Sequence, residues 1–179
     1  MNKMIEVIDN FLDLKSHQVI VDTVLSNQKF PWELSDVIGR KAIKDGTFSL
    51  MCDPTLNFQF IHRLSRNIYF DNFGDSEYLY LIVPFYSRLE IKSIFTAKLN
   101  YVPVWNEVIH HGMHQDNPFD NTTTAIYYIN TNNGTTLFED GTEVSSVANR
   151  LVKFPSKIRH SGSTCTDKSG RVVLNINYF

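Results

Sequence analysis

Several features that mark specialised protein classes are scarce in this sequence. Glycine and proline number only 8 and 6 among 179 residues, too few for a fibrous or disordered chain. Cysteine occurs twice, as Cys52 and Cys165, at no zinc-finger spacing. We expect free thiols in a reducing compartment, with a single disulfide as the alternative. The net charge of −2 provides no positive field that would attract nucleic acid.

Export signals and long apolar segments are also missing. Glu6 and Asp9 interrupt the first apolar run, so it does not resemble a signal peptide. The longest apolar run, residues 78–86, is shorter than the roughly 20 residues that cross a bilayer. Hydrophobic residues make up 42% of the chain, which suffices for one sizeable core. We therefore predict a single cytoplasmic domain, residues 1–179, that contacts neither membrane nor nucleic acid.

Helical signals are confined to the first half of the chain. Apolar residues recur with helical spacing over residues 13–26, 55–69 and 77–89. Asp13 or Ser16 is a candidate cap for the first of these helices. We therefore predict that residues 1–90 form mostly helical support for the rest of the domain.

Strand signals dominate after residue 91. Turn residues such as Asn132-Asn133-Gly134 and Asp140-Gly141 separate short β-rich segments, a pattern typical of a β-sandwich or barrel. The predicted fold class is α+β, with a double-sheet core in residues 91–179 and helices outside it. A short strand is expected within residues 4–12, and loop with short strands over 27–56. The main strands are expected at 93–104, 108–114, 123–130, 135–138, 142–148, 150–154, 159–164 and 171–179.

The segment His114-Gln115-Asp116 carries the clearest chemical signal. Residues two apart on a strand project to the same side, so His114 and Asp116 can reach one ion while Gln115 faces away. His160, on another predicted strand, is the best candidate for a third ligand. Two imidazoles and one carboxylate leave coordination positions open and suit Fe(II). The alternative is that His114 and Asp116 form a surface pair at a turn.

Arg171 opens the apolar final strand, where we expect it to be at least partly buried. A buried guanidinium requires an anionic partner, and its planar fork matches a carboxylate. We interpret it as a clamp for the distal carboxylate of a dicarboxylate co-substrate. The alternative is a surface arginine paired with Asp167.

These elements together resemble a known family, the prolyl-hydroxylase-type 2-oxoglutarate/Fe(II) oxygenases. The resemblance covers about residues 98–179, and the first half looks like the compact single-domain members found in phages and bacteria. It would place a phage-encoded protein in the host cytoplasm. The matching elements, in order, are His114-Gln115-Asp116-Asn117-Pro118, Ala125-Ile126-Tyr127-Tyr128-Ile129-Asn130, Asn133-Gly134-Thr135-Thr136-Leu137-Phe138, His160 and Arg171.

The resemblance implies a double-stranded β-helix, or jelly roll, with Fe(II) held by the two histidines and the aspartate. It implies 2-oxoglutarate as co-substrate and ascorbate as an optional further cofactor. Arg171 and Tyr128 would bind the far carboxylate of 2-oxoglutarate, and Tyr101 would line its pocket. The gap from Tyr101 to the metal motif is longer here than in the family.

The implied reaction is hydroxylation of a substrate C–H bond, with release of succinate and CO₂. Halogenating relatives lack the carboxylate that Asp116 provides, so its presence favours hydroxylation. The leading substrate is a prolyl residue of a peptide or protein; another protein side chain or a small molecule are the alternatives.

Other polar and aromatic residues receive weaker interpretations. Asn177 shares strand parity with Arg171 and would approach the metal or substrate, unless it is only a satisfied inward polar residue. Trp105 opens the loop before the metal motif, and residues 105–109 or 36–53 would supply a lid. His110 and His111 are interpreted as parts of an exposed loop, with a role beside substrate or metal as the alternative.

Two alternative functions remain. A non-catalytic jelly-roll binding module would be expected to lose metal ligands, which are all present here. A cupin-like metalloenzyme that does not use 2-oxoglutarate would more often carry a His-x-His pair and would lack an arginine in the position of Arg171.

Overall fold

The computed structural model of the chain describes residues 4–35, 40–42, 48–50, 58–66, 75–117 and 119–179. The helical elements are α1 (Leu14–Val21), continued by the π-helical segment η1 (Asp22–Ser26), and the 3₁₀ segment η2 (Glu77–Ile82), continued by α2 (Val83–Leu89). The strands are β1 (Glu6–Ile8), β2 (Glu33–Ser35), β3 (Arg40–Ala42), β4 (Phe48–Leu50), β5 (Gln59–Arg66), β6 (Ile94–Pro103), β7 (Thr123–Tyr128), β8 (Thr135–Phe138), β9 (Glu143–Ser145), β10 (Arg150–Pro155), β11 (His160–Gly162) and β12 (Gly170–Tyr178).

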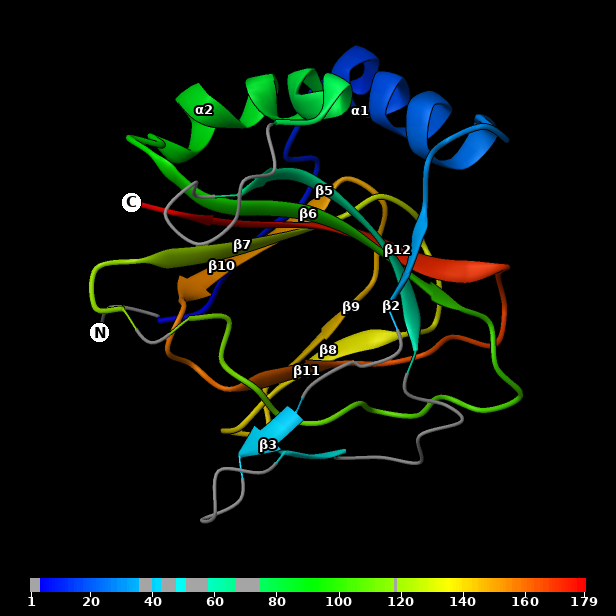
Figure 1. Ribbon diagram of the computed structural model, residues 1–179, viewed down its shortest axis with the longest axis vertical. Coiled ribbons are helices and arrows are strands. Elements are labelled where there is room, and N and C mark those ends of the chain that lie inside the picture. Colours follow the sequence, from blue (N-terminus) through cyan, green and yellow to red (C-terminus); the bar gives the residue numbers. More distant parts are fainter. Residues whose placement is uncertain (1–3, 36–39, 43–47, 51–57, 67–74, 118) are drawn as a thin grey trace.

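Two antiparallel sheets face each other and form the core. The large sheet has the order β1-β10-β7-β12-β6-β5-β2, and the small sheet has the order β11-β8-β9. A separate pair, β3-β4, lies at the end of the molecule away from the helices (Figure 1). Strands adjacent in the large sheet, such as β7 and β12, are far apart in sequence, so the sheet forms only when distant segments of the chain pair.

Successive side chains of the central strand β12 point alternately to the two faces of the large sheet. Val172, Leu174 and Ile176 point toward the helices and pack with residues of α1, η2 and α2. Figure 1 shows those helices lying across one face of the sheet. Val173, from the opposite parity, packs between the two sheets with Tyr128 of β7 and residues of the small sheet. Polar side chains of β12 that share the parity of Val173 therefore lie on the face between the two sheets.

The helix-covered face should carry much of the folding energy. Leu174 is fully buried there, so Leu174→Ala should lower the free energy of unfolding by about 2–5 kcal/mol, through lost burial and the cavity left behind. Leu14, on α1 and 80% exposed, is the matched control, and Leu14→Ala should change it by less than about 0.5 kcal/mol. Urea denaturation of both variants measures the difference. Equal effects of the two substitutions would contradict this packing.

Several predicted elements are confirmed. The helix expected over residues 13–26 is α1 with η1, and Asp13 caps it by accepting a hydrogen bond from the Ser16 amide at 3.0 Å. The helix expected over 77–89 is η2 with α2. The α+β class with a double-sheet core is also as predicted.

Two predicted elements are wrong. The segment 55–69 contains no helix in its described part; it forms β5, hydrogen-bonded between β6 and β2. Ile61 and Leu64 are both buried although they lie on opposite faces of the strand, so the apolar pattern did not alternate. Residues 108–114 form no continuous strand, only isolated bridges at His110 and His114.

The division of the chain at residue 90 also differs from the prediction. Strands β1, β2 and β5 from the first half belong to the large sheet, so the first half builds core as well as support.

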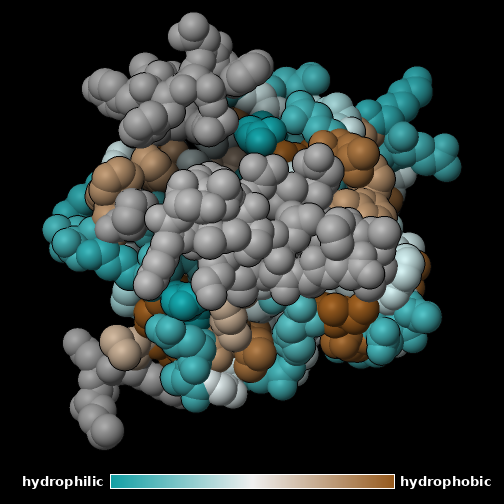
Figure 2. Space-filling view, turned by 60° about the horizontal axis from the view of Figure 1, so that its bottom comes forward, coloured by the Kyte–Doolittle hydropathy of each residue, from teal (hydrophilic) through white to brown (hydrophobic). Residues whose placement is uncertain are grey.

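Within the described residues no helix is long and apolar enough to cross a membrane. Cys165 is a free, buried thiol, whereas Cys52 lies outside the described residues. On the face in Figure 2, hydrophobic and hydrophilic residues alternate among the described parts of the surface.

Candidate metal centre and anion site

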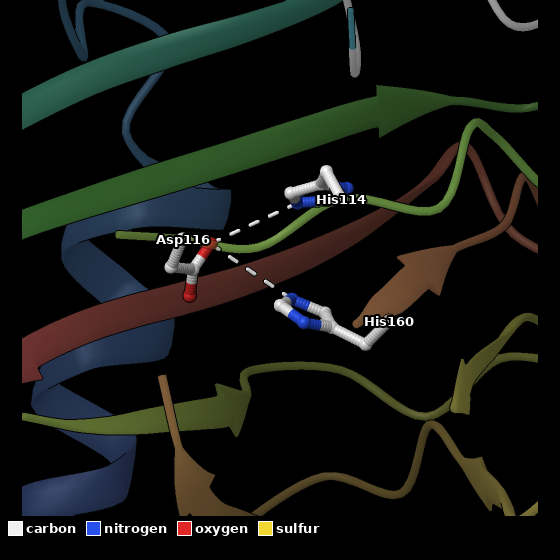
Figure 3. A group of neighbouring side chains, drawn as sticks. All are labelled: His114, Asp116 and His160. Atoms are coloured by element: carbon white, nitrogen blue, oxygen red, sulfur yellow. Dashed lines mark ion pairs between the residues drawn. The ribbon is translucent and has the colours of Figure 1, made fainter. Parts of the chain in front are cut away.

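His114, Asp116 and His160 meet at one point between the sheets (Figure 3). Asp116 Oδ1 lies 3.7 Å from His114 Nε2 and 3.9 Å from His160 Nε2. One donor atom from each residue lies within 4.8 Å of the others. These separations are somewhat wider than those of ligands about 2 Å from one ion, so small side-chain movements would bring all three atoms onto a common cation.

A backbone bridge brings the two histidines together. His114 and His160 exchange N–H···O=C hydrogen bonds of 2.9 Å in both directions, which locks the loop before Asp116 against β11. The Nδ1 atom of His114 lies 3.0 Å from the Gly112 carbonyl, and that of His160 lies 3.2 Å from the Ile158 carbonyl. Each Nδ1–H can donate to its carbonyl, which leaves Nε2 as a lone-pair donor facing the common centre.

Asp116 is oriented by two hydrogen bonds to its other oxygen. Thr124 Oγ1 donates to Asp116 Oδ2 at 2.9 Å, and Asn175 Nδ2 donates to the same atom at 3.1 Å. Burial alone would raise the pKa of this carboxyl, but His160, His114 and the two hydrogen bonds outweigh burial and hold the pKa below its ordinary value. Asp116 is therefore a carboxylate with Oδ1 free to bind a cation.

His160 is kept in its metal-binding form by its surroundings. Burial lowers its pKa, and this outweighs the opposite influence of Asp116. A neutral imidazole binds a metal, whereas an imidazolium cannot. Two imidazoles and a carboxylate, with no thiolate, fit Fe(II) with open coordination positions better than a closed structural zinc site.

A cavity of about 280 Å³ adjoins these three residues and extends to Arg171. Arg171 is 3% exposed, and burial lowers its pKa. Its Nε donates to Ser146 Oγ at 2.9 Å and its Nη2 donates to Thr136 Oγ1 at 2.8 Å. Among the described residues, no carboxylate lies within ion-pairing distance of it, and Asp167 instead accepts from the Asn133 amide. The alternative of a surface pair with Asp167 is therefore excluded, and within the described part of the chain the buried cation has no anionic partner.

Two glycines leave room for the Arg171 side chain. A Cβ at Gly162 would come within 3.1 Å of Arg171 Nη1, and a Cβ at Gly134 within 2.9 Å of Arg171 Cδ. Tyr128 lies beside the same guanidinium, whose Cζ is 5.5 Å from the ring centroid. The Tyr128 hydroxyl donates to Thr136 Oγ1 at 2.8 Å, the atom that also accepts from Arg171. Arg171 and Thr136 therefore line the cavity, and Tyr128 lies behind them, in contact with both but outside the cavity lining.

Two other candidates, Tyr101 and Trp105, lie elsewhere. Tyr101 does not line the cavity: its hydroxyl donates to the Ser169 carbonyl at 2.8 Å and its ring packs on Trp32. The alternation of β6 sends its neighbours Asn100 and Val102 into the cavity instead, because residue 101 has the opposite parity. Trp105 is 39% exposed and outside the cavity, so the structure brings neither aromatic residue to the metal ligands.

Asn177 is buried and joins the network behind Asp116. Its Oδ1 lies 2.8 Å from the Thr124 hydroxyl oxygen, and that hydroxyl donates to Asp116. Asn177 Nδ2 also donates to Asn175 Oδ1 at 2.8 Å. Asn177 therefore acts on the carboxylate through two intermediaries, as the inward parity suggested.

Other cavity-lining residues were missed or misassigned from sequence. His111 was interpreted as part of an exposed loop but is 5% exposed and lines the cavity. Gln59 of β5 lines it as well, which the erroneous helix assignment concealed. Gln115 also reaches its edge, although its amide donates to the Lys157 carbonyl at 2.8 Å. Of the two segments proposed as lids, residues 36–53 lie largely outside the described residues.

No family model matches the sequence, and no curated protein sequence matches it significantly. Solved structures do match. An oxidoreductase of the 2OG-Fe(II) oxygenase family from Burkholderia pseudomallei has a TM-score of 0.67 at 13% identity, covering 99% of this chain and 86% of that one. A prolyl hydroxylase from Trichoplax adhaerens, in complex with a peptide fragment of the hypoxia inducible factor oxygen degradation domain, has a TM-score of 0.66 at 16% identity, covering 99% and 84%.

A viral collagen prolyl hydroxylase from Paramecium bursaria Chlorella virus-1, in its 2-oxoglutarate complex, also matches, with a TM-score of 0.54 at 13% identity, covering 99% of this chain and 98% of that one. Likeness at such low identity establishes the fold. The predicted jelly roll is confirmed by it, together with the facing sheets. This chain has the jelly-roll fold of prolyl hydroxylases and of a 2-oxoglutarate/Fe(II) oxygenase.

Proposed function

We propose that this chain is an Fe(II)- and 2-oxoglutarate-dependent oxygenase that hydroxylates a substrate C–H bond and releases succinate and CO₂. The observation that carries the proposal is one cavity with two complementary ends. At one end His114, Asp116 and His160 offer two nitrogens and one oxygen to a cation. At the other, Arg171 is a buried cation that has no carboxylate partner among the described residues. A dicarboxylate between them satisfies both ends.

The residues fit the two groups by their chemistry. Fe(II), bound with 2-oxoglutarate, would supply the activation of O₂. His114, Asp116 and His160 would hold the ion, and Thr124 and Asn175 would keep Asp116 oriented. Arg171 would bind the far carboxylate of 2-oxoglutarate, with Tyr128 and Thr136 beside it. Ile126 and Val173 would exclude water from the middle of the cavity.

A prolyl residue of a peptide or protein is the substrate that we propose first. The Trichoplax relative in fold binds a peptide fragment, and the viral one is a collagen prolyl hydroxylase. We extend this substrate class to the present chain on fold and site chemistry together. The free, buried Cys165 suits the reducing cytoplasm in which we place the protein.

The two alternatives fit the site less well. A non-catalytic binding module does not require three oriented metal-ligand side chains. A cupin-like enzyme that does not use 2-oxoglutarate has no use for a buried arginine facing the metal, because an unpaired buried cation destabilises the fold. Arg171 is therefore the residue that separates the first proposal from both alternatives.

The test is anaerobic titration of 2-oxoglutarate into the Fe(II)-loaded protein, followed by visible absorption. We expect a weak lilac charge-transfer band that saturates at about one equivalent per metal. The band requires no knowledge of the substrate. Iron binding without a band would favour the cupin-like alternative, and absence of iron binding would favour the binding module.

A further inference from the structure

Unpaired buried polar atoms are concentrated in the same cavity. Among the described residues, the buried side-chain atoms without a hydrogen-bond partner are Asn100 Oδ1, His110 Nδ1, and both Nδ1 and Nε2 of His111. Asn100 and His111 line the cavity, whereas His110 does not. Buried polar groups are nearly always paired in folded proteins. An imidazole with neither nitrogen paired, in the wall of a ligand cavity, points to a partner that arrives with the ligand.

The backbone of His111 is held while its ring is left without a partner. Its amide donates to the Gly162 carbonyl at 2.9 Å, and its carbonyl accepts from Ser161 Oγ at 2.5 Å. Both contacts attach residue 111 to β11, the strand that begins with the metal-ligand candidate His160. The backbone is therefore anchored at a point from which the ring lines the cavity. A 180° rotation of the imidazole ring about the Cβ–Cγ bond exchanges the positions of a ring carbon and a ring nitrogen on the edge that faces the cavity.

Charged and polar groups from both ends of the cavity act on His111, which lines the same cavity. Burial, followed by the nearby Arg171, His114 and His110, lowers its pKa to about 4. Arg171 is the proposed clamp and His114 a proposed metal ligand, so the imidazole lies within reach of the field of both. At neutral pH it carries one N–H donor and one lone pair. All oxygens of 2-oxoglutarate are acceptors, so this donor has a complementary partner.

We propose that His111 is a positioning residue for the co-substrate, donating a hydrogen bond to an oxygen of 2-oxoglutarate held between Arg171 and the metal ligands. The inference rests on the proposed function and adds a contact made by a residue that is neither ligand nor clamp. His111 orients the keto acid through this contact. Its second nitrogen accepts from a water or from substrate.

The test measures the dissociation constant of 2-oxoglutarate by calorimetry on the Mn(II)-loaded protein, without turnover. His111→Phe keeps an aromatic ring and removes both nitrogens, and it should raise the dissociation constant at least tenfold. His111→Gln restores an N–H donor and should stay within about threefold of wild type. His110→Phe is the matched control: it changes the neighbouring histidine, which faces Glu143 outside the cavity, and should leave the constant unchanged.

The outcomes separate this inference from the proposed function. If wild type binds Mn(II) but no 2-oxoglutarate, the proposed function fails. If wild type binds 2-oxoglutarate and His111→Phe binds it within twofold, the positioning role is overturned and the proposed function stands. Equal losses in His111→Phe and His111→Gln also overturn it, since a structural effect then replaces the donated hydrogen bond. Thermal melting without ligand verifies that the variants are folded.

Discussion

Arg171→Met should abolish the binding of 2-oxoglutarate while leaving the ligand-free protein at least as stable as wild type. The guanidinium is buried and has no carboxylate partner among the described residues, so its desolvation is uncompensated without ligand. Methionine fills a similar volume without charge. We expect the free energy of unfolding to stay equal or rise by up to about 2 kcal/mol, since the loss of hydrogen bonds to Ser146 and Thr136 opposes the gain.

With 2-oxoglutarate present, wild type should instead have the larger free energy of unfolding. At a hundred times its dissociation constant, 2-oxoglutarate should stabilise the metal-loaded wild type by about 2.7 kcal/mol and Arg171→Met by almost nothing. Thermal unfolding with and without 2-oxoglutarate measures both effects in one experiment. A variant that binds 2-oxoglutarate within fivefold of wild type would remove Arg171 from the clamp.

Arg150→Met is the matched control for this experiment. Arg150 is also a strand arginine, but it is paired with Asp9 at 2.6 Å near the surface. Removing that partly exposed pair should cost less than about 1 kcal/mol, because solvent screens it. The binding of 2-oxoglutarate should not change. A loss of binding in both variants would indicate a general charge effect in place of a specific clamp.

Asp116→Ala should lower the affinity for Fe(II) or Mn(II) by more than about 100-fold, because it removes the only carboxylate of the proposed ligand set. Asn175→Leu leaves all ligands in place but removes a hydrogen bond to Asp116, so the affinity should fall by about 10–100-fold. Anaerobic calorimetry with Mn(II) measures both changes. The order of the two effects tests the roles of ligand and orienting residue separately.

Asp120→Asn is the control for the loss of a carboxylate. Asp120 is exposed and pairs with Lys157, so its replacement should leave metal affinity unchanged. Unaltered metal binding in Asp116→Ala would exclude Asp116 as a ligand.

Strand parity explains why much of the site was predictable from sequence. Arg171, Asn175 and Asn177 share one face of β12, whereas His114 lies at an isolated bridge and Asp116 outside any strand. Local alternation carries such information directly, since a side chain's face depends only on its position along the strand. Tyr101 was assigned to the pocket by resemblance alone, and its position on β6 puts it on the opposite face from Asn100 and Val102, which line the cavity.

The sequence by itself determined the fold class, the chemical types of the ligand set and the inward face of β12, because these depend on residue identity and short-range periodicity. Tertiary structure alone decided three further features: that β5 is a strand, that a bridge joins His114 to His160, and that His111 lies inside. Each depends on pairing between segments far apart in the chain. Local patterns do not encode such pairings, because burial on both faces of a segment removes the alternation by which a strand is recognised.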